Sequence, residues 1–232
     1  MTEPAERPYL SVIIPTLDEA LHIDAVLADV LTGERLEVLG VDGGSRDATL
    51  ERAALFGVRT CRAPAGRARQ MNLGAAMARG TFLFFLHADS RLPAGFDRVI
   101  RRVLADSRVA AGAFSLEIDA ADRRLRMVAW GANLRSRVFG LPYGDQGLFL
   151  RASRFQLCGG FPDLPIMEDF VLMRRLRKMG SIVTVPERIL TSPRRWRDQG
   201  VLRTTLINQA IVMAYLLGIP ADRLRRWYRR PR

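Results

Sequence analysis

The chain has 232 residues, 48% of them hydrophobic, which is enough for the core of one generous globular domain. Its two cysteines, Cys61 and Cys158, exclude a disulfide framework and lack metal-ligand spacing, so a reducing, cytoplasmic compartment is expected. The formal charge of +12, carried almost wholly by arginine, favours anionic partners such as sugar nucleotides, phospholipid surfaces or nucleic acid.

Strand and helix patterns alternate through the first half of the chain. After residues 1–8, which show no signal-peptide pattern, strands are predicted at 9–16, 36–41, 58–61 and 81–86. Helices are predicted between and after them, at 19–31, 47–56, 66–79 and 95–104. This order predicts an α/β fold with a single, mostly parallel, Rossmann-like sheet that has helices on both faces.

The second half of the chain is less regular. Strands are predicted at 111–118, 147–151 and 182–185, and helices at 122–138, 153–157 and 168–179. The segments 140–144 and 159–165 are rich in glycine and proline, so they are predicted to be loops.

The C-terminal region combines an apolar segment with a cluster of arginines. Residues 206–219 are too few to span a bilayer, which needs about 20 apolar residues, so a buried helix or a helix at a membrane surface or dimer contact is expected. Six arginines follow it, and they form either a solvated tail or a membrane-surface contact: Arg223, Arg225, Arg226, Arg229, Arg230 and Arg232.

Acidic residues follow three of the predicted parallel strands. The buried strand 82–86 ends at His87 and Asp89, and Asp42 and the pair Asp18-Glu19 follow two other strands. Each acid alone could be a helix cap or a turn residue. Because the carboxyl ends of parallel strands meet at one edge of the sheet, three such acids together predict a binding site there for a metal or a polar substrate.

Six short motifs resemble, in order, those of family 2 glycosyltransferases with the GT-A fold. They are residues 11–19, 41–47, 66–74, 87–89, 168–169 and 194–196. The resemblance covers about residues 9–197 and is closest to small bacterial members associated with radical-SAM or selenium-related clusters. It implies a GT-A catalytic domain at 1–200 and a helical, arginine-rich extension of the same domain at 201–232.

The resemblance implies an inverting glycosyltransferase that moves a sugar from a UDP- or GDP-linked donor to a hydroxyl acceptor. The implied donor-binding residues are Pro15, Thr16, Glu19, Asp42, Arg67, Arg69 and His87. Asp89 is the implied ligand of a divalent cation, Mn²⁺ or Mg²⁺. His87 stands where the family carries the first acid of its D-x-D motif, which removes one carboxylate from a hard-metal site.

The catalytic and acceptor-side residues are implied in the same way. Asp169 matches the general base that takes the proton of the attacking hydroxyl, and Glu168 beside it matches a catalytic-site residue with a positioning or structural role. Five residues are assigned to the acceptor side, with stacking or packing both open for the tryptophan: Gly112, Asp145, Gln146, Arg195 and Trp196.

Two other kinds of protein compete with this interpretation. A nucleotidyltransferase would have a glycine-rich basic loop after the first strand, whereas residues 16–19 are acidic and contain no glycine. A basic module for membranes or nucleic acid would account for the charge, but aromatic and basic residues are interleaved only at 225–229. We therefore expect no nucleic-acid partner, a cytoplasmic enzyme with peripheral contact at the inner face of the membrane, and an acceptor that could be lipid-linked; a homodimer stays open.

Overall fold

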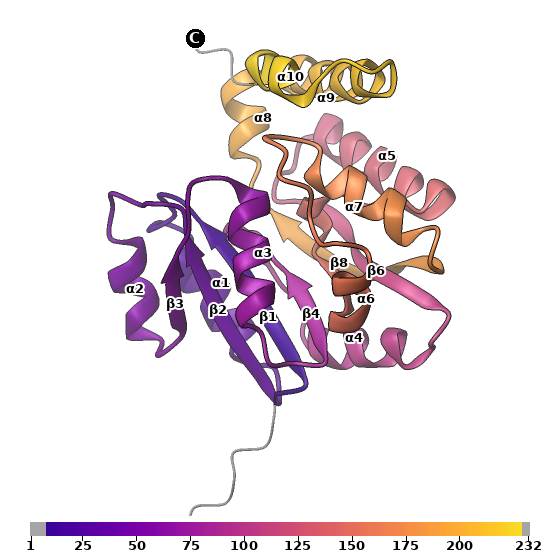
Figure 1. The fold of residues 1–232 in the computed structure, drawn as a ribbon. Helices are drawn as coiled ribbons and strands as arrows, with labels where there is room; N and C mark the ends of the chain where they lie inside the picture. Colours follow the sequence, from indigo (N-terminus) through magenta and orange to yellow (C-terminus); the bar gives the residue numbers. More distant parts are fainter. Residues whose placement is uncertain (1–7, 229–232) are drawn as a thin grey trace, which may run out of the picture.

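The computed structural model describes residues 8–228, apart from the side chains of Arg195 and Tyr228. Its eight strands form one sheet in the order β3-β2-β1-β4-β7-β6-β8-β5 (Figure 1). The strands are β1 (Leu10–Thr16), β2 (Leu36–Asp42), β3 (Arg59–Arg62), β4 (Phe82–Phe85), β5 (Ser90–Arg91), β6 (Val109–Ile118), β7 (Leu148–Arg151) and β8 (Ser181–Thr191).

Helices cover both faces of this sheet. They are α1 (Ile23–Val30), α2 (Thr49–Leu55), α3 (Arg67–Met77), α4 (Phe96–Ala105), α5 (Arg123–Phe139), α6 (Ala152–Leu157), α7 (Glu168–Leu176), α8 (Arg194–Gln199), α9 (Val201–Leu216) and α10 (Ala221–Tyr228), with a 3₁₀ turn η1 (Gly144–Gln146). The predicted α/β architecture is confirmed.

Side chains of the central strands alternate between two apolar cores. On β4, Phe82 and Phe84 point into one core, while Leu83 and Phe85 point into the other, and all four are at most 2% exposed. Burying a side chain of this size contributes roughly 1.5–3 kcal/mol, so the continuous apolar run places this strand in the middle of the sheet.

The three strands that precede the acidic motifs lie side by side and run parallel. β1 is paired with β2 on one side and β4 on the other, with Thr16 opposite Asp42. The backbone N–H of Leu86, just after β4, donates to the carbonyl of Ile13 at 3.0 Å. The strand ends therefore meet at one edge, as the sequence predicts.

The other half of the sheet contains antiparallel pairings that the sequence does not reveal. β7 is antiparallel to both β4 and β6, and the two-residue β5 is antiparallel to β8. The strand predicted at 182–185 extends to Thr191, although Pro186, Glu187 and Arg188 interrupt its apolar pattern. Pairing β7 with β4 brings the loop before β7 to the edge where the acidic motifs lie.

The last two helices form a separate layer, drawn in yellow in Figure 1. A small apolar cluster of Ile211, Ala214 and Leu224 packs against Ile166 and Met167, which precede α7. The helix expected at 206–219 begins earlier, at Val201. Within the described residues, no helix is long and apolar enough to cross a bilayer.

Candidate active site

The loops after β1 and β2 are bound together by hydrogen bonds and form one wall of the site. The backbone N–H groups of Asp18, Glu19 and Ala20 donate to the side chains of Ser45, Thr49 and Asp47 at 2.9–3.0 Å. In return, Asp18 accepts from the N–H of Arg46 at 2.8 Å. The two motifs are therefore one structural unit.

Asp42 is fully buried at the end of β2. Its carboxylate accepts from the backbone N–H groups of Gly44 and Ser45 at 3.0–3.2 Å and from the Ser45 hydroxyl. The side chain thus forms an Asx-type turn that shapes the loop. The pairing of Thr16 with Asp42 also places the predicted donor residues Pro15 and Thr16 at this edge.

Gln70 on α3 holds the ends of β1 and β2 at a fixed separation. Its Nε2 donates to the carbonyls of both Thr16 and Val41 at 2.8 Å. A Cβ atom at Gly43 would lie 3.1 Å from the Gln70 amide, so a glycine suits this close approach.

Glu19, in the loop after β1, is close enough to Asp89 for their charges to interact. Glu19 Oε1 accepts from Arg194 of α8 at 3.2 Å, whereas Oε2 is buried without a hydrogen-bond partner. Burial raises the pKa of Glu19; the charge of Asp89 adds to the rise and Arg194 opposes it.

This pair fits a divalent cation. No cluster of three side chains suited to a metal occurs within residues 8–228. However, Mn²⁺ and Mg²⁺ are commonly held by one or two carboxylates together with substrate phosphates and water. A cation beside Asp89 would offset its repulsion of Glu19 and give the unpartnered Oε2 a counter-charge.

A small cleft lies where α3, α7 and the loop before β7 face the end of β4. Nine residues line it: Arg67, Met71, Phe85, His87, Gly144, Leu148, Phe161, Glu168 and Asp169. It joins four of the predicted site residues, Arg67, His87, Glu168 and Asp169, which come from three distant parts of the chain.

Gly144 lies between His87 and Asp169. Its backbone N–H donates to Asp169 Oδ2 at 2.8 Å, and a Cβ atom at this position would lie only 2.9 Å from His87 Nε2. That nitrogen is buried and has no hydrogen-bond partner. Burial, and to a smaller extent the charge of Arg67, lowers the pKa of His87 to about 3, so the imidazole is neutral at physiological pH.

Glu168 occupies the most protected position among the acids of the cleft. It is 5% exposed, and Arg67 Nη1 lies 3.7 Å from its Oε1. Burial and then the charge of Asp169 raise the pKa of Glu168 to about 7, with Arg67 opposing the rise. Asp169 is more exposed and additionally accepts from the N–H of Phe170 at 2.7 Å. Neighbouring carboxyls in different environments can take different roles in acid–base chemistry.

Asp145 adds a third carboxyl near the cleft. Its Oδ1 is buried without a partner, and burial raises its pKa, with Asp169 adding to the rise and Arg135 opposing it. The Arg135 guanidinium lies 3.4 Å above the ring of Tyr143 and donates to the carbonyl of Leu141. α5 therefore fixes the loop that carries Asp145.

Two residues assigned to the acceptor side are instead part of the interior. Gln146 is fully buried; its Nε2 donates to the Phe114 carbonyl and Ser136, and its Oε1 accepts from Arg135 and the N–H of Tyr143. A Cβ atom at Gly112 would lie 2.2 Å from the Phe149 ring. Both predictions are corrected, because neither residue is accessible to an acceptor.

The remaining predicted residues lie at the margin of the cleft or outside it. Arg69 forms a bidentate ion pair with Asp163 of the 159–165 loop, with N–O distances of 2.9–3.1 Å. Trp196 is 9% exposed and packs in the larger core with its Nε1 unpartnered, which favours the packing interpretation. The Arg195 side chain lies outside what the structure describes.

Sequence reasoning missed Gly144 and Arg194 as parts of the site. Gly144 stands in the loop 140–144 that was predicted from its glycine and proline content, and Arg194 belongs to the last of the six motifs. Their residue types and positions in the sequence only weakly indicated that Gly144 and Arg194 belong to the site. Their partners, Asp169 and Glu19, are 25 and 175 residues away in the chain.

The sequence is similar to known glycosyltransferases. The model of the family described as Glycosyl transferase family 2 matches residues 11–147, more than half of the chain. A PGL/p-HBAD biosynthesis glycosyltransferase of Mycobacterium tuberculosis is 37% identical over 94 residues, and so is one of Mycobacterium bovis. The match covers 37% of this chain and 37% of each relative, so the chain spans just over a third of the curated relatives it matches.

Solved glycosyltransferases share the fold. A mannosyltransferase from Pyrobaculum calidifontis, in complex with GDP-Man and Mn²⁺, has a TM-score of 0.68 at 20% identity over 93% of this chain and 66% of its own. TarS of S. aureus with UDP-GlcNAc has a TM-score of 0.65 at 15% identity, over 79% and 58% of the two chains. Glucosyl-3-phosphoglycerate synthase of M. tuberculosis scores 0.60 at 18% identity, over 88% and 79%. The predicted GT-A fold is confirmed.

Proposed function

The chain belongs to glycosyl transferase family 2, and on this premise we propose that it is an inverting glycosyltransferase acting on a UDP- or GDP-linked sugar. The observation that carries the proposal is the cleft, in which Asp169 faces His87 and Arg67 at the edge where β1, β2 and β4 end. In sheets of this kind, ligands bind beyond the carboxyl ends of the strands.

The loops after β1 and β2 suit the nucleoside part of the donor. Pro15, Thr16 and the turn shaped by Asp42 line the strand ends, and Glu19 lies beside them. Both Asp42 oxygens already accept hydrogen bonds from the turn. We therefore assign the contacts to uridine or guanosine to the turn that Asp42 shapes as well as to the Asp42 carboxylate.

The diphosphate fits between the end of β4 and the start of α3. Guanidinium groups bind phosphate with paired hydrogen bonds, and Arg67 stands at the first position of α3, whose N-terminus favours anions. Arg69 would have to leave Asp163 to contribute. A divalent cation held by Asp89, with Glu19 nearby, would supply positive charge to the departing diphosphate.

Asp169 is the general base of the proposed reaction. An acceptor hydroxyl loses its proton to the Asp169 carboxylate as its oxygen attacks the anomeric carbon and the bond to the diphosphate breaks. Attack from the face opposite the leaving group inverts the anomeric centre. The Gly144 N–H fixes the carboxylate, and neutral His87 offers a hydrogen bond to the donor at the cleft floor.

Calorimetry with UDP, GDP and Mn²⁺, followed by a donor hydrolysis screen, tests the donor class. We expect one nucleoside diphosphate to bind more tightly with Mn²⁺ than without, and the matching sugar nucleotide to release that diphosphate. Failure to bind either nucleotide would contradict the proposal.

The variant Asp89→Ala tests the cation separately. It removes the proposed ligand, so we expect the gain in nucleotide affinity from Mn²⁺ to fall roughly tenfold or more, since metal contacts to phosphate contribute several kcal/mol. Affinity without metal should stay near that of the wild type. Asp198→Ala, an exposed acid on α8, is the matched control and should keep the full Mn²⁺ effect. An unchanged Mn²⁺ effect in Asp89→Ala would reject Asp89 as the ligand.

A further inference from the structure

Large apolar side chains on the surface are concentrated on α5, α9 and α10. Those exposed elsewhere are single, scattered leucines: Leu17, Leu21, Leu31, Leu55 and Leu157. All the others lie on α5, α9 and α10, apart from Leu217, which directly follows α9. Isolated exposed leucines are ordinary on a protein surface, whereas a concentration of them indicates an interaction site.

On α5 these residues form a stripe that points away from the sheet. The helix buries Leu125, Ala129 and Ser136 against the sheet. Its exposed apolar residues recur three or four positions apart, which places them on the opposite face: Met127, Trp130, Leu134 and Val138. Trp130 is 67% exposed, so the stripe faces solvent.

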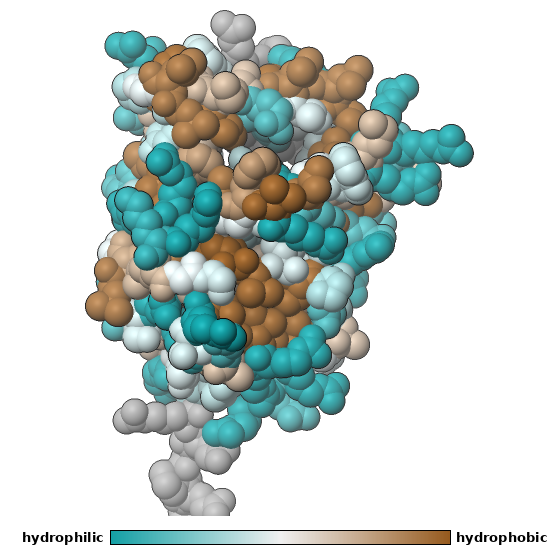
Figure 2. Space-filling model, turned by 90° about the vertical axis from the view of Figure 1, so that its right-hand side faces the viewer, coloured by the Kyte–Doolittle hydropathy of each residue, from teal (hydrophilic) through white to brown (hydrophobic). Residues whose placement is uncertain are grey.

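α9 repeats the arrangement. It buries Thr204, Ile211 and Ala214 toward the body of the protein. A second apolar stripe lies on its outer face and runs into the following turn: Leu202, Leu206, Met213, Leu216 and Leu217. Helices α5 and α9 contact each other, and Figure 2 shows brown, apolar side chains gathered over the top of the molecule, where α9 and α10 lie in Figure 1.

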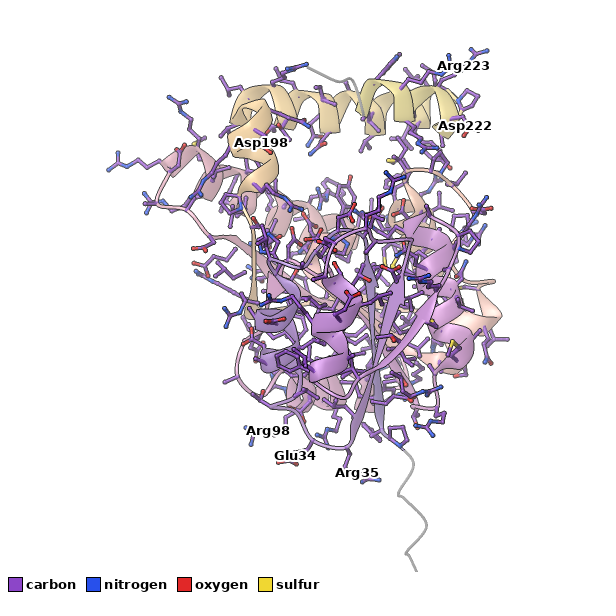
Figure 3. The ribbon with its side chains drawn as sticks, turned by 90° about the vertical axis from the view of Figure 1, so that its left-hand side faces the viewer. Glu34, Arg35, Arg98, Asp198, Asp222 and Arg223 are labelled. Atoms are coloured by element: carbon purple, nitrogen blue, oxygen red, sulfur yellow. The ribbon has the colours of Figure 1, made fainter. Side chains whose placement is uncertain are left out.

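Arginines flank both stripes. None of their guanidinium groups forms an ion pair within residues 8–228, and all are exposed: Arg123, Arg124 and Arg126 on α5, Arg203 on α9, and Arg223, Arg225 and Arg226 on α10. Figure 3 shows Arg223 on the outer layer, at the opposite end of the molecule from Glu34, Arg35 and Arg98. The predicted cluster continues to Arg229, Arg230 and Arg232, which lie outside the described residues.

We infer that α5, α9 and α10 together form a docking surface for an anionic lipid bilayer. Unpaired arginines complement negatively charged headgroups, and apolar stripes that include an exposed tryptophan enter the headgroup boundary. A protein partner or second copy would cover apolar area equally well, but it would not account for seven arginines without acidic partners beside the stripes.

The position of this surface has a consequence for the acceptor. The chain leaves α5 at Gly140 and reaches Gly144, which bonds Asp169, within four residues. If the proposed function holds, the base therefore stands close to the bilayer, and the acceptor hydroxyl belongs to a membrane lipid or a lipid-linked molecule. The docking itself does not depend on sugar transfer.

Sedimentation with vesicles tests the docking without any sugar nucleotide. Wild-type protein should pellet with phosphatidylcholine–phosphatidylglycerol vesicles, bind phosphatidylcholine alone much more weakly, and be released by added salt. Three variants should each lower the partition coefficient roughly tenfold or more: Trp130→Ser with Leu134→Ser; Leu206→Ser with Met213→Ser; and Arg223→Ser with Arg225→Ser and Arg226→Ser.

Two matched controls remove the same kinds of side chain elsewhere. Leu55→Ser with Leu157→Ser, and Arg98→Ser with Arg108→Ser and Lys178→Ser, should bind the vesicles like the wild type. Wild-type protein that stays in the supernatant, or surface variants that bind normally, would overturn the inference. So would a dimer in sedimentation velocity that the Leu206 and Met213 changes dissociate. Nucleotide calorimetry on the same samples reports on the proposed function independently.

Discussion

Replacing Asp169 with asparagine should lower the rate of sugar transfer by 10²- to 10⁴-fold while leaving the affinity for the nucleoside diphosphate nearly unchanged. This is the range that a positioned general base typically contributes, and an amide cannot take up the acceptor proton. Asparagine has nearly the same shape, and its single carbonyl oxygen can still accept from the Gly144 N–H, with loss of the bond from the Phe170 N–H. The fall in transfer rate should therefore come from the missing base and not from a change in structure.

Single-turnover kinetics and calorimetry on the same variant separate these effects. Asp198→Asn makes the same change at an exposed acid on α8 that does not line the cleft, and should retain wild-type turnover. A parallel fall in nucleotide affinity would indicate a collapsed cleft, and turnover that survives in Asp169→Asn would show that another group is the base.

The parallel half of the fold was predictable because its signals are local. β4 is apolar on both faces, and the acids at the ends of β1, β2 and β4 follow their strands directly. Parallel strands place these ends at one edge whatever the rest of the chain does. The convergence of the three strand ends at one edge follows from that rule, whereas the strand order is seen only in the structure.

Four members of the cleft were identified from the sequence, but its contacts were not. His87 and Asp169 were identified from motifs, yet their approach through Gly144 depends on β7 lying antiparallel to β4. No pattern in residues 147–151 distinguishes an antiparallel from a parallel strand. Tertiary pairing therefore decided the geometry.

The two acceptor-side errors have a related cause. Gly112 and Gln146 belong to segments near the cleft, and their residue types are compatible with a ligand contact. The ring of Phe149 fills the space over Gly112, and Ser136 and the Phe114 carbonyl satisfy the Gln146 amide. These partners come from distant segments, so burial could not be read from the sequence.

Glu168 should make the stability of the protein fall as pH rises from about 4.5 to about 7. In the folded protein its pKa is about 7, raised first by burial and then by Asp169, whereas the unfolded chain releases this proton near pH 4.5. The unfolded state thus binds fewer protons across that window, which lowers the free energy of unfolding. The loss is at most about 3.5 kcal/mol, since one pKa unit corresponds to about 1.4 kcal/mol.

Glu168→Gln removes this titration, so urea unfolding of both proteins at pH 5 and pH 8 isolates it. From pH 5 to pH 8, the free energy of unfolding of the variant should rise relative to that of the wild type by up to about 3 kcal/mol, because each pKa unit is about 1.4 kcal/mol. Glu51→Gln, a change at an exposed acid on α2, should follow the wild type. Equal pH dependence in the wild type and Glu168→Gln would contradict the raised pKa.

The same measurement links the two acids of the cleft. Asp169 repels the charged form of Glu168, so Asp169→Asn should lower the pKa of Glu168 and narrow the window in which stability falls. Arg67, 3.7 Å from Glu168, acts in the opposite direction, and Arg67→Gln should widen the window. Because burial and Asp169 raise the pKa of Glu168 to about 7, roughly half of the Glu168 carboxyls carry a proton at neutral pH. Asp169, which the Gly144 N–H holds in the cleft, is the proposed acceptor of the hydroxyl proton.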